Sequence, residues 1–153
     1  MNFVISKANA DVEGRVINQL IDEYASSCNN IVSFTSLRSF KYLSALKYAL
    51  MVIGNSSSGL VEAPSFGIPT INIGDRQKGR LQASSVINCN ATQESIRKAL
   101  ALASSKEFLE KASKTANPYG DGNTSDKIIA VVKDCVLCDK IDIKKKFYNC
   151  EAK

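Results

Sequence analysis

The sequence predicts an α/β fold in which a parallel β-sheet is covered by helices on both faces. Short apolar runs of strand length alternate along the chain with stretches in which apolar residues recur at helical spacing. Because parallel strands need a long crossover connection, usually a helix, this alternation favours a parallel sheet. With 153 residues, of which 44% are hydrophobic, the chain is long enough to bury a core. We therefore expect one Rossmann-like domain over residues 1–147 and a short tail at 148–153.

Five apolar runs predict the strands, and they cover residues 2–6, 31–34, 50–53, 70–73 and 85–88. The predicted helices carry apolar stripes over residues 16–24, 40–46, 96–103 and 128–143. Thr92 and Glu94 mark the start of the third stripe, because a threonine cap and an early acid are typical of a helix N-terminus. Turn-forming residues at 117–123 predict a loop before the last helix.

The chain has a modest positive charge, and the charge is dispersed. The formal net charge of +5 comes from 20 basic and 15 acidic residues along the whole sequence. Three consecutive lysines at 144–146 are typical of a solvated helix end, and no aromatic residues interleave with basic ones elsewhere. We therefore expect no nucleic-acid partner. A positive balance of this size suits a small anionic ligand such as a phosphate ester.

Five cysteines and no histidine restrict the metal sites that the chain can form. Cys135 and Cys138 form a C-x-x-C pair in a predicted helix, but without a histidine they do not complete a common zinc set, so no metal is expected. The first residues do not resemble a signal peptide, which favours a cytoplasmic protein with reduced thiols. No apolar run approaches the roughly 18 residues of a membrane span, so no membrane partner is expected.

Two loops that follow predicted strands carry residues suited to ligand binding, because open parallel sheets bind ligands beyond the carboxyl ends of their strands. Residues 54–59 read Gly-Asn-Ser-Ser-Ser-Gly at the point where a helix is expected to begin. Free backbone N–H groups there, with the hydroxyls of Ser56 and Ser57, would hold a phosphate or pyrophosphate. The alternative is that these serines only cap the helix.

Neither a Walker motif nor a three-glycine dinucleotide motif is present, so no ATP, NAD or other cofactor is predicted. Glu62 is expected about one and a half turns into the helix, where its carboxylate would accept two hydrogen bonds from a ribose diol. Its alternative role is to complement the helix dipole. The second loop places Arg76, Lys78 and Arg80 between flexible glycines, which suits closing over a phosphate.

The ordered set of these residues resembles the hydrolysing UDP-N-acetylglucosamine 2-epimerases of sialic acid synthesis. The similarity rests on GNSSSG at 54–59 and on the following run at 62–80, EAPSFGIPTINIGDRQKGR. It continues upstream through KANAD at 7–11 and GRVIN at 14–18, and downstream to about Asp126. The serine triplet alone is a weak motif, whereas the ordered set with its spacing is specific and covers nearly the whole chain.

The resemblance implies a glycosyltransferase-B type fold, with two Rossmann-like halves and the nucleotide sugar in the cleft between them. This chain would be the C-terminal half, its ligand UDP or a UDP-sugar, and its partner the missing N-terminal Rossmann-like domain. An exposed cleft face would also promote homo-oligomers. By motif, the resemblance assigns Ser56 and Ser57 to the diphosphate, Glu62 to the ribose, Arg76 to the phosphate side, and Asn9, the backbone of Leu37, and Tyr42 to the uridine side or the cleft.

The reaction implied by the resemblance is an anti elimination of UDP to a 2-acetamidoglucal, followed by hydration to N-acetylmannosamine, without a metal or redox cofactor. The family's proton-transfer acids, and a phosphate-side histidine, belong to the half that is absent. Glu62 and Asp75 are the only acids near the cleft loops, and neither is paired with a second carboxylate, as acid–base chemistry at C2 would require. We therefore expect no catalytic residue in this chain and little or no turnover alone.

Two alternatives stay open beside an epimerase half acting on UDP-N-acetylglucosamine. One is the same half of a hydrolysing epimerase whose substrate is a UDP-2,4-diacetamido-6-deoxy sugar. The other is a stand-alone UDP-sugar binding module without catalysis.

Overall fold

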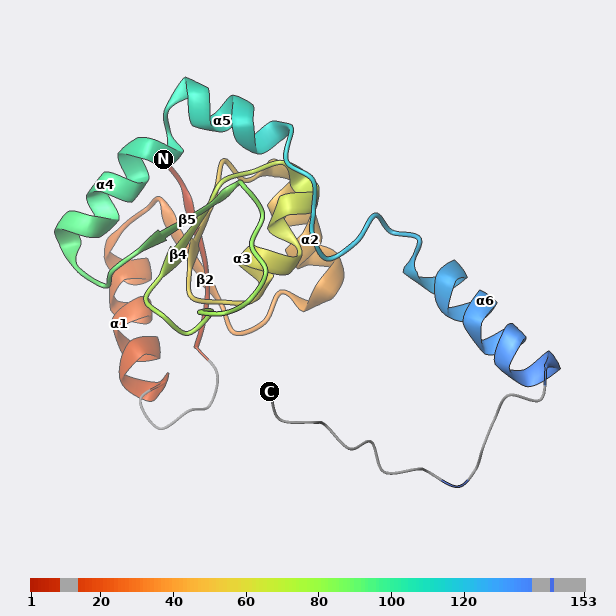
Figure 1. Cartoon of the computed structure of the whole chain (residues 1–153). Coiled ribbons are helices and arrows are strands. Elements are labelled where there is room, and N and C mark those ends of the chain that lie inside the picture. The colour runs from red at the N-terminus through yellow and green to blue at the C-terminus, as the bar shows by residue number, and fades with distance from the viewer. Residues whose placement is uncertain (9–13, 139–143, 145–153) are drawn as a thin grey trace. The chain divides into compact units, whose positions relative to one another are not determined.

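The computed structural model describes residues 1–8, 14–138 and 144 of the chain. Two units are distinguished, Met1–Ala116 and Asn117–Lys153, and each is described by itself. The first unit holds every described strand and is built from parallel sheets and helices (Figure 1). The predicted α/β fold with parallel strands is therefore confirmed.

The first two strands form a parallel pair with a helix between them. β1 (Phe3–Ser6) pairs with β2 (Ile31–Phe34), and α1 (Gly14–Ser27) makes the crossover and contacts β2. The crossover is the element that a parallel pair requires, because the chain must return to the starting edge before the second strand begins.

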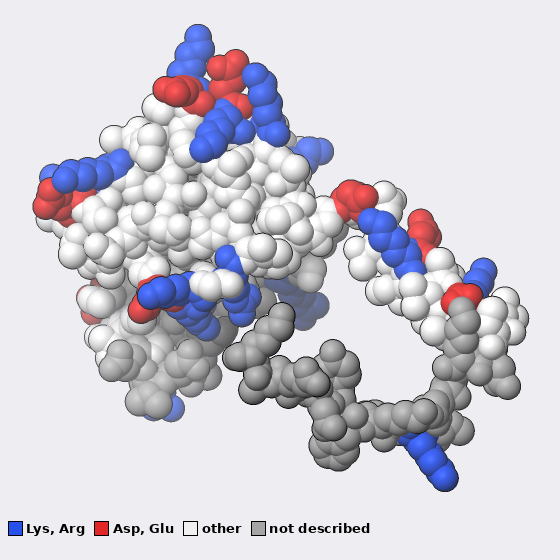
Figure 2. Space-filling view, in the orientation of Figure 1, with Lys and Arg blue, Asp and Glu red and all other residues white. Residues whose placement is uncertain are grey.

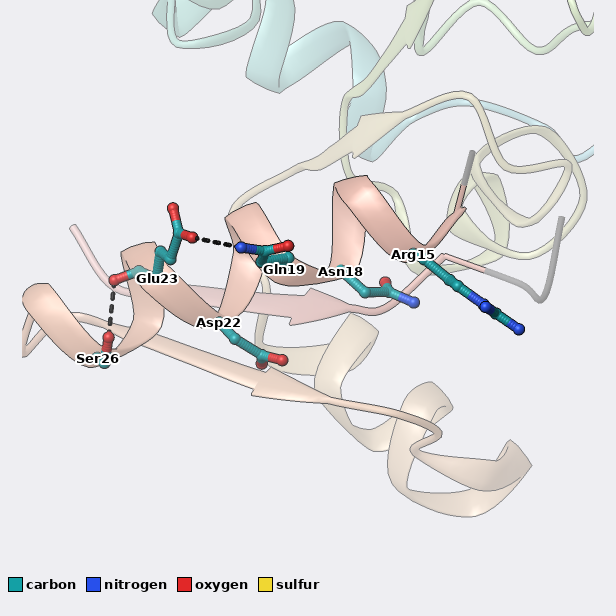
Figure 3. A pocket seen from close by; sticks show the side chains of 6 residues that line it. All are labelled: Arg15, Asn18, Gln19, Asp22, Glu23 and Ser26. Atoms are coloured by element: carbon teal, nitrogen blue, oxygen red, sulfur yellow. Dashed lines mark hydrogen bonds between the residues drawn. The ribbon is translucent and has the colours of Figure 1, made fainter. Parts of the chain in front are cut away.

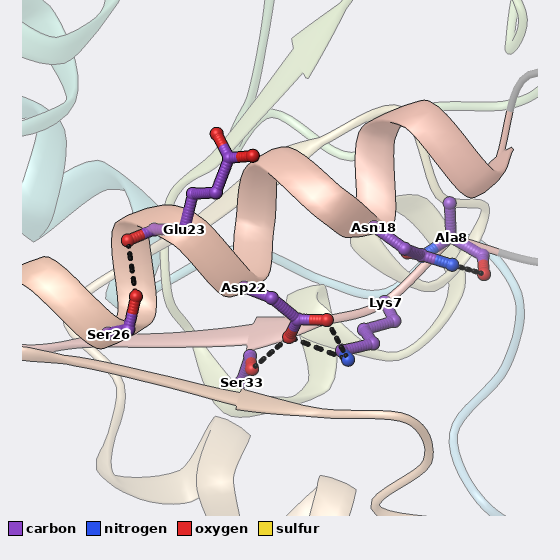
Figure 4. Close-up of polar contacts among 7 residues, drawn as sticks. All are labelled: Lys7, Ala8, Asn18, Asp22, Glu23, Ser26 and Ser33. Atoms are coloured by element: carbon purple, nitrogen blue, oxygen red, sulfur yellow. Dashed lines mark hydrogen bonds and ion pairs between the residues drawn. The ribbon is translucent and has the colours of Figure 1, made fainter.

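Polar contacts tie α1 to this pair of strands (Figure 4). The ammonium of Lys7, just after β1, lies 2.6 Å from an Asp22 carboxylate oxygen, and the Ser33 hydroxyl of β2 donates to Asp22 at 3.4 Å. The side chain of Asn18 accepts the Ala8 N–H at 2.8 Å and donates to the Ala8 carbonyl at 3.2 Å. These contacts fix Lys7 and Ala8, which follow β1, to the helix.

The other three strands form a second parallel sheet with β4 at its centre. β3 (Val52–Gly54), β4 (Thr70–Ile73) and β5 (Val86–Cys89) follow one another in both sequence and space. All five predicted strands are present, each within two residues of its expected ends. The hydrogen bonds join them as separate two-stranded and three-stranded sheets, whereas one sheet was expected. Apolar periodicity sets the buried face of a strand but not its hydrogen-bonded neighbour, so the sequence does not distinguish these arrangements.

Five helical segments accompany the strands from β2 onward in the first unit: α2 (Arg38–Tyr48), α3 (Ser58–Val61), the 3-10 helix η1 (Ala63–Phe66), α4 (Gln93–Ala103) and α5 (Lys106–Ser113). The predicted start of α4 is confirmed, because the Thr92 side chain accepts the Ser95 N–H at 3.3 Å. The sequence pattern did not identify α5, which begins where the Ser105 hydroxyl accepts the Phe108 N–H at 3.2 Å.

Helices cover both faces of the second sheet. Ile71 of β4 is fully buried and packs with Ala99 and Ala103 of α4. The preceding residue, Thr70, points to the opposite face, since successive side chains of a strand alternate. On that face the Thr70 hydroxyl donates to the Gly59 carbonyl of α3 at 2.8 Å. The predicted covering of a parallel sheet on two sides is confirmed for this sheet.

Gly59 allows α3 to lie directly against β4. A Cβ built on Gly59 would lie 2.7 Å from Cγ2 of Thr70, closer than real Cβ contacts. Both residues are buried, and Thr70 is held by its bond to the Gly59 carbonyl, so it cannot easily move away. The glycine here serves close approach of helix and strand.

The second unit contains one described helix, α6 (Thr124–Leu137). The helix has no buried residue, and both signs of charge lie along it (Figure 2). Its large apolar side chains are at least half exposed: Ile128, Ile129, Val131, Val132, Val136 and Leu137. The predicted last helix is confirmed up to residue 137, whereas its expected continuation through 139–143 lies outside the described residues.

Three further findings concern only the described part of the chain. No helix in it is both long enough and apolar enough to cross a membrane. Its four cysteines, Cys28, Cys89, Cys135 and Cys138, are free thiols. It holds no group of three or more histidine, cysteine or acidic side chains arranged for a metal ion.

The variant Gly59→Ala tests the contact between α3 and β4. We expect it to lower the free energy of unfolding by about 1–3 kcal/mol, the usual cost of overpacking, even though alanine favours helix more than glycine does. Urea denaturation measures the change.

The matched double variant is Gly59→Ala with Thr70→Ser, which removes the clashing methyl group and keeps the hydroxyl. It should recover part of the lost stability, so that the two changes are not additive. A single variant as stable as the wild type would contradict the close contact.

Candidate functional site

The two loops expected to bind ligand begin at one edge of the second sheet. The serine loop (residues 55–57) follows β3, and the basic loop (residues 74–80) follows β4. Gly54 of β3 pairs with Asn72 of β4 near the carboxyl ends of both strands. The loops therefore start close together at the edge where open parallel sheets bind their ligands.

The serine loop offers backbone donors. Within the part of the chain that the structure describes, the N–H groups of Ser56 and Ser57 make no hydrogen bond. The Ser56 hydroxyl accepts the Ser58 N–H at a long 3.3 Å, and the Ser57 side chain makes no capping bond to α3. Helix capping therefore does not occupy the Ser57 hydroxyl, and two N–H groups are available to an anion.

The helix after the serine loop is shorter than the sequence suggested. α3 has four residues and passes into η1, so few peptide dipoles are aligned behind the loop. Pro64 lacks the N–H that would continue the α-helical ladder. Glu62 consequently lies between the two short helices, and not one and a half turns into a single long one. An anion at the serine loop would be bound by individual N–H groups, with little help from a helix dipole.

Glu62 lies in a cluster with two hydroxyl groups. Its Oε2 atom is buried and has no hydrogen-bond partner in the described chain. The Tyr42 hydroxyl, brought from α2, is hydrogen-bonded to the Ser58 hydroxyl. Burial raises the pKa of Tyr42 above 10.0, and the negative charge of Glu62 adds to this rise, while the Ser58 bond opposes it. A buried carboxylate oxygen without a donor suits a ligand that carries hydroxyls.

Gln77 connects the two loops, and sequence reasoning missed it. It lies in the basic loop between Arg76 and Lys78, which are exposed, yet Gln77 itself is buried. Its Nε2 donates to the backbone oxygen of Asn55 in the serine loop at 2.7 Å. A glutamine between two cations gives no pattern that distinguishes a buried side chain from a solvated one, so only the tertiary structure identifies it.

A row of amide side chains fixes the far end of the basic loop. Asn72 of β4 donates to Asn88 of β5 at 2.8 Å, and Asn88 donates to Gln82 at 2.8 Å. Gln82 returns a longer bond to Asn88 at 3.3 Å. Gln77 thus joins the basic loop to the serine loop, and Gln82, just after the basic loop, joins the chain to β5.

The remaining predicted residues are less closely connected to this cluster. Leu37 is half-buried and directly precedes α2, the helix that carries Tyr42. The next residue, Arg38, has φ of 51°, an uncommon value for a residue with a side chain, and such strain often occurs near functional sites. Asn9 lies outside the described residues. It follows Ala8, whose backbone N–H and carbonyl are both hydrogen-bonded to the Asn18 side chain.

The structure thus brings some predicted residues together and leaves others unconnected. Tyr42 bonds to Ser58, directly after Ser56 and Ser57, and Glu62 is near enough to raise the pKa of Tyr42. The exposed Arg76 belongs to the neighbouring loop that Gln77 attaches to Asn55. No contact of Leu37 with this cluster is described.

Of two depressions on the described surface, the larger is not at these loops. It has a volume of about 670 Å³ and runs along the polar side of α1, as Figure 3 shows, lined by Arg15, Asn18, Gln19, Asp22, Glu23 and Ser26. The smaller, about 370 Å³, lies at the carboxyl ends of β4 and β5 and includes Gly74 and Asp75 of the basic loop. We place the candidate site at the loops, because none of the predicted binding residues that the structure describes lines the groove on α1.

Comparison with known proteins gives one family. A family profile described as UDP-N-acetylglucosamine 2-epimerase matches residues 1–133. The chain is 40% identical to a hydrolysing GDP/UDP-N,N'-diacetylbacillosamine 2-epimerase of Campylobacter jejuni, over 97% of this chain and 38% of that protein. It is 34% identical to the polysialic acid biosynthesis protein P7 of Escherichia coli, over 97% and 37%. A UDP-N-acetylglucosamine 2-epimerase of Neisseria meningitidis is 32% identical, over 97% and 38%. The chain therefore spans little more than a third of these relatives.

Solved structures show the same fold at lower identity. A UDP-GlcNAc 2-epimerase of Neisseria meningitidis bound to UDP-GlcNAc superposes with a TM-score of 0.67 at 23% identity, covering 86% of this chain and 36% of that one. The complex of S. aureus MnaA with UDP gives a TM-score of 0.69 at 19% identity, covering 97% and 39%. At these identities the likeness establishes the fold, and with it the half of a glycosyltransferase-B type architecture expected from the sequence.

The raised pKa of Tyr42 predicts a pH dependence of stability. Above pH 10.0 the unfolded chain releases the tyrosine proton that the folded chain keeps, so the free energy of unfolding should fall as pH rises through the interval between the two pKa values. An ultraviolet titration of phenolate absorbance in wild type and Tyr42→Phe isolates this group as a difference curve. In denaturant the midpoint of the difference curve should return to the ordinary pKa of tyrosine. A native difference curve centred at or below 10.0 would contradict the burial of the hydroxyl.

Proposed function

The chain belongs to the UDP-N-acetylglucosamine 2-epimerase family, and on that premise we propose that it binds the UDP part of a UDP-sugar at the serine and basic loops. The observation that carries the proposal is the buried carboxylate oxygen of Glu62, which has no hydrogen-bond donor among the described residues and whose charge acts on the nearby Tyr42 hydroxyl. An unpaired buried polar atom costs about 1–3 kcal/mol, and a ligand that donates to it relieves that cost. A ribose, with two adjacent hydroxyls, has the required chemistry.

The diphosphate is proposed to bind between the two loops. Ser56 and Ser57 supply N–H groups that have no partner among the described residues, and Ser57 adds a hydroxyl that caps nothing. Arg76 adds a guanidinium from the basic loop, and a guanidinium forms two parallel hydrogen bonds to a phosphate. It is exposed and makes no ion pair within the described chain, so its charge is available.

The uridine base is proposed to lie toward the start of α2. Tyr42 is already beside Glu62, and the Leu37 backbone is at the N-terminal end of the same helix. Asn9 is proposed for this side on the basis of the family motif alone.

The whole protein is proposed to convert UDP-N-acetylglucosamine to N-acetylmannosamine and UDP. The resemblance supports elimination of UDP followed by hydration, a route that needs acid–base groups at C2 of the sugar. Glu62 and Asp75 are the acids nearest the loops, and the chain has no histidine. We therefore propose that this chain supplies nucleotide binding and that the catalytic acids belong to another part of the protein.

A second substrate is favoured by one observation. The identity to the hydrolysing diacetylbacillosamine epimerase, 40%, exceeds the identity to the N. meningitidis UDP-N-acetylglucosamine 2-epimerase, 32%. A UDP-2,4-diacetamido-6-deoxy sugar is therefore the alternative substrate. Both substrates present the same UDP group, so the loops described here serve either reaction.

We propose that a second Rossmann-like lobe, N-terminal to these residues, completes the site. The relatives are more than twice as long as the matched region, which supports further structure around it. A second copy of the chain is the alternative partner. Residues 1–147 are proposed to work as one nucleotide-binding domain, in the cytoplasm, where free thiols persist.

The variant Glu62→Gln tests ribose recognition. In calorimetric titrations, the wild type should bind UDP more tightly than 2′-deoxy-UDP, because the deoxy ligand lacks one donor to the carboxylate. Glu62→Gln should weaken UDP binding by about tenfold or more, since hydrogen bonds to a charged group contribute about 1.5–3 kcal/mol, and should reduce the preference for the ribose.

The matched control is Glu94→Gln, which removes an exposed acid that pairs with Lys98 on α4. It should leave both affinities unchanged. Absence of UDP binding by the wild type at millimolar ligand would disprove the pocket assignment.

A second test concerns catalysis by the chain alone. Incubation of the purified chain with UDP-N-acetylglucosamine should release no N-acetylmannosamine, because the catalytic acids are proposed to belong to another part of the protein. Turnover that copurifies with the chain and is lost in Glu62→Gln would contradict the proposal that the catalytic acids belong to another part of the protein.

A further inference from the structure

Gln77 is a buried side chain that none of the proposed ligand contacts uses. Only 3% of it is exposed, although both neighbours in the basic loop are exposed cations. Its Nε2 donates to the Asn55 carbonyl at 2.7 Å, while its Oε1 is buried with no partner among the described residues. A buried amide with an unused acceptor adds little to stability, so its placement calls for another explanation.

The carbonyl that Gln77 binds belongs to the same peptide group as the Ser56 N–H. A peptide group is planar and trans, so the Asn55 C=O and the Ser56 N–H point in opposite directions. Fixing the Asn55 oxygen therefore fixes the direction of the Ser56 N–H. The hydrogen bond also polarises the peptide group, which strengthens its N–H as a donor.

That N–H is one of the two donors in the serine loop that have no protein partner. Its direction is set from outside its own loop, because Gln77 follows β4 whereas Asn55 follows β3. Arg76 directly precedes Gln77, so the anchored glutamine also restricts where the guanidinium can reach. One hydrogen bond thus fixes the position of the Ser56 N–H in one loop relative to that of Arg76 in the other.

We propose that Gln77 is a positioning residue that aims the Ser56 N–H and joins the basic loop to the serine loop, so that both act on one diphosphate. The proposal rests on the UDP-binding function above and specifies how its diphosphate part is organised. It predicts that Gln77 affects ligands with a diphosphate and has little effect on uridine.

The test is an NMR titration of the full chain, labelled with nitrogen-15, with UDP and with uridine. Methionine matches glutamine in length and lacks the amide donor, so Gln77→Met removes the bond to Asn55. We expect the UDP affinity to fall by about tenfold and the uridine affinity to change by less than about twofold. In the wild type UDP should shift the Ser56 amide resonance and uridine should not; in Gln77→Met this UDP-specific shift should be lost.

The matched control is Ser85→Ala, which alters another buried side chain with an unpartnered polar atom in the same β4–β5 connection. It makes no bond to the serine loop and should keep the wild-type ratio of UDP to uridine affinity. Gln77→Glu is the second variant, in case Gln77→Met does not fold. It keeps the size and places an acceptor against the Asn55 carbonyl, so the UDP-specific shift of Ser56 should again be lost.

Three outcomes overturn the inference, and they differ in what else they affect. A folded Gln77→Met with the wild-type affinity ratio disproves the positioning role and leaves the UDP site intact. Equal losses of UDP and uridine affinity, with a lowered melting temperature, identify a purely structural role. A wild type that binds neither ligand disproves the proposed function and this inference with it.

Discussion

The contact between Gly59 and Thr70 determines where the two ends of α3 lie. Ser58 and Glu62, which belong to the candidate site, are located at these two ends. Since Gly59 has no side chain, the Thr70 hydroxyl reaches its carbonyl at 2.8 Å and the helix lies against the sheet. Ser58 begins this helix and bonds to Tyr42, and Glu62 follows its last residue. A bulkier residue would displace the helix and, with it, the carboxylate and the hydroxyl cluster together.

Neutral amides and not ion pairs organise the loops around that contact. Gln77 holds the serine loop, and the row from Asn72 through Asn88 to Gln82 holds the basic loop to the sheet. The ion pairs on α4 and α5 are solvent-exposed and lie on other elements, and such pairs contribute little to stability. An uncharged framework does not neutralise the cations of the basic loop, so their charge remains for an anionic ligand. Donors fixed in advance also reduce the ordering cost of binding.

The sequence predicted the parts of this protein that depend on local pattern. Apolar runs predicted the five strands, and Thr92 predicted the start of α4. The assignment of the two polar loops after β3 and β4 to ligand binding stays a prediction. α5 gives only a weak pattern because its apolar side chains are few. α3 is shorter than the pattern predicts because Pro64 lacks the N–H that would continue the helix. Gln77 was missed for a different reason: its burial and its bond to Asn55 depend on two loops meeting in space, which no local pattern records.

The order of the strands has a consequence for how the chain acquires its structure. Every described strand pair joins strands that are consecutive in sequence: β1 with β2, β3 with β4, and β4 with β5. Each pairing therefore closes the shortest loop that a parallel arrangement allows, and shorter closures lose less chain entropy and form faster. A chain leaving the ribosome can add each strand to the one made just before it, without waiting for a distant segment. The bond from Asn88 of β5 to Gln82, just after the basic loop, can form only once β5 has been added to the sheet.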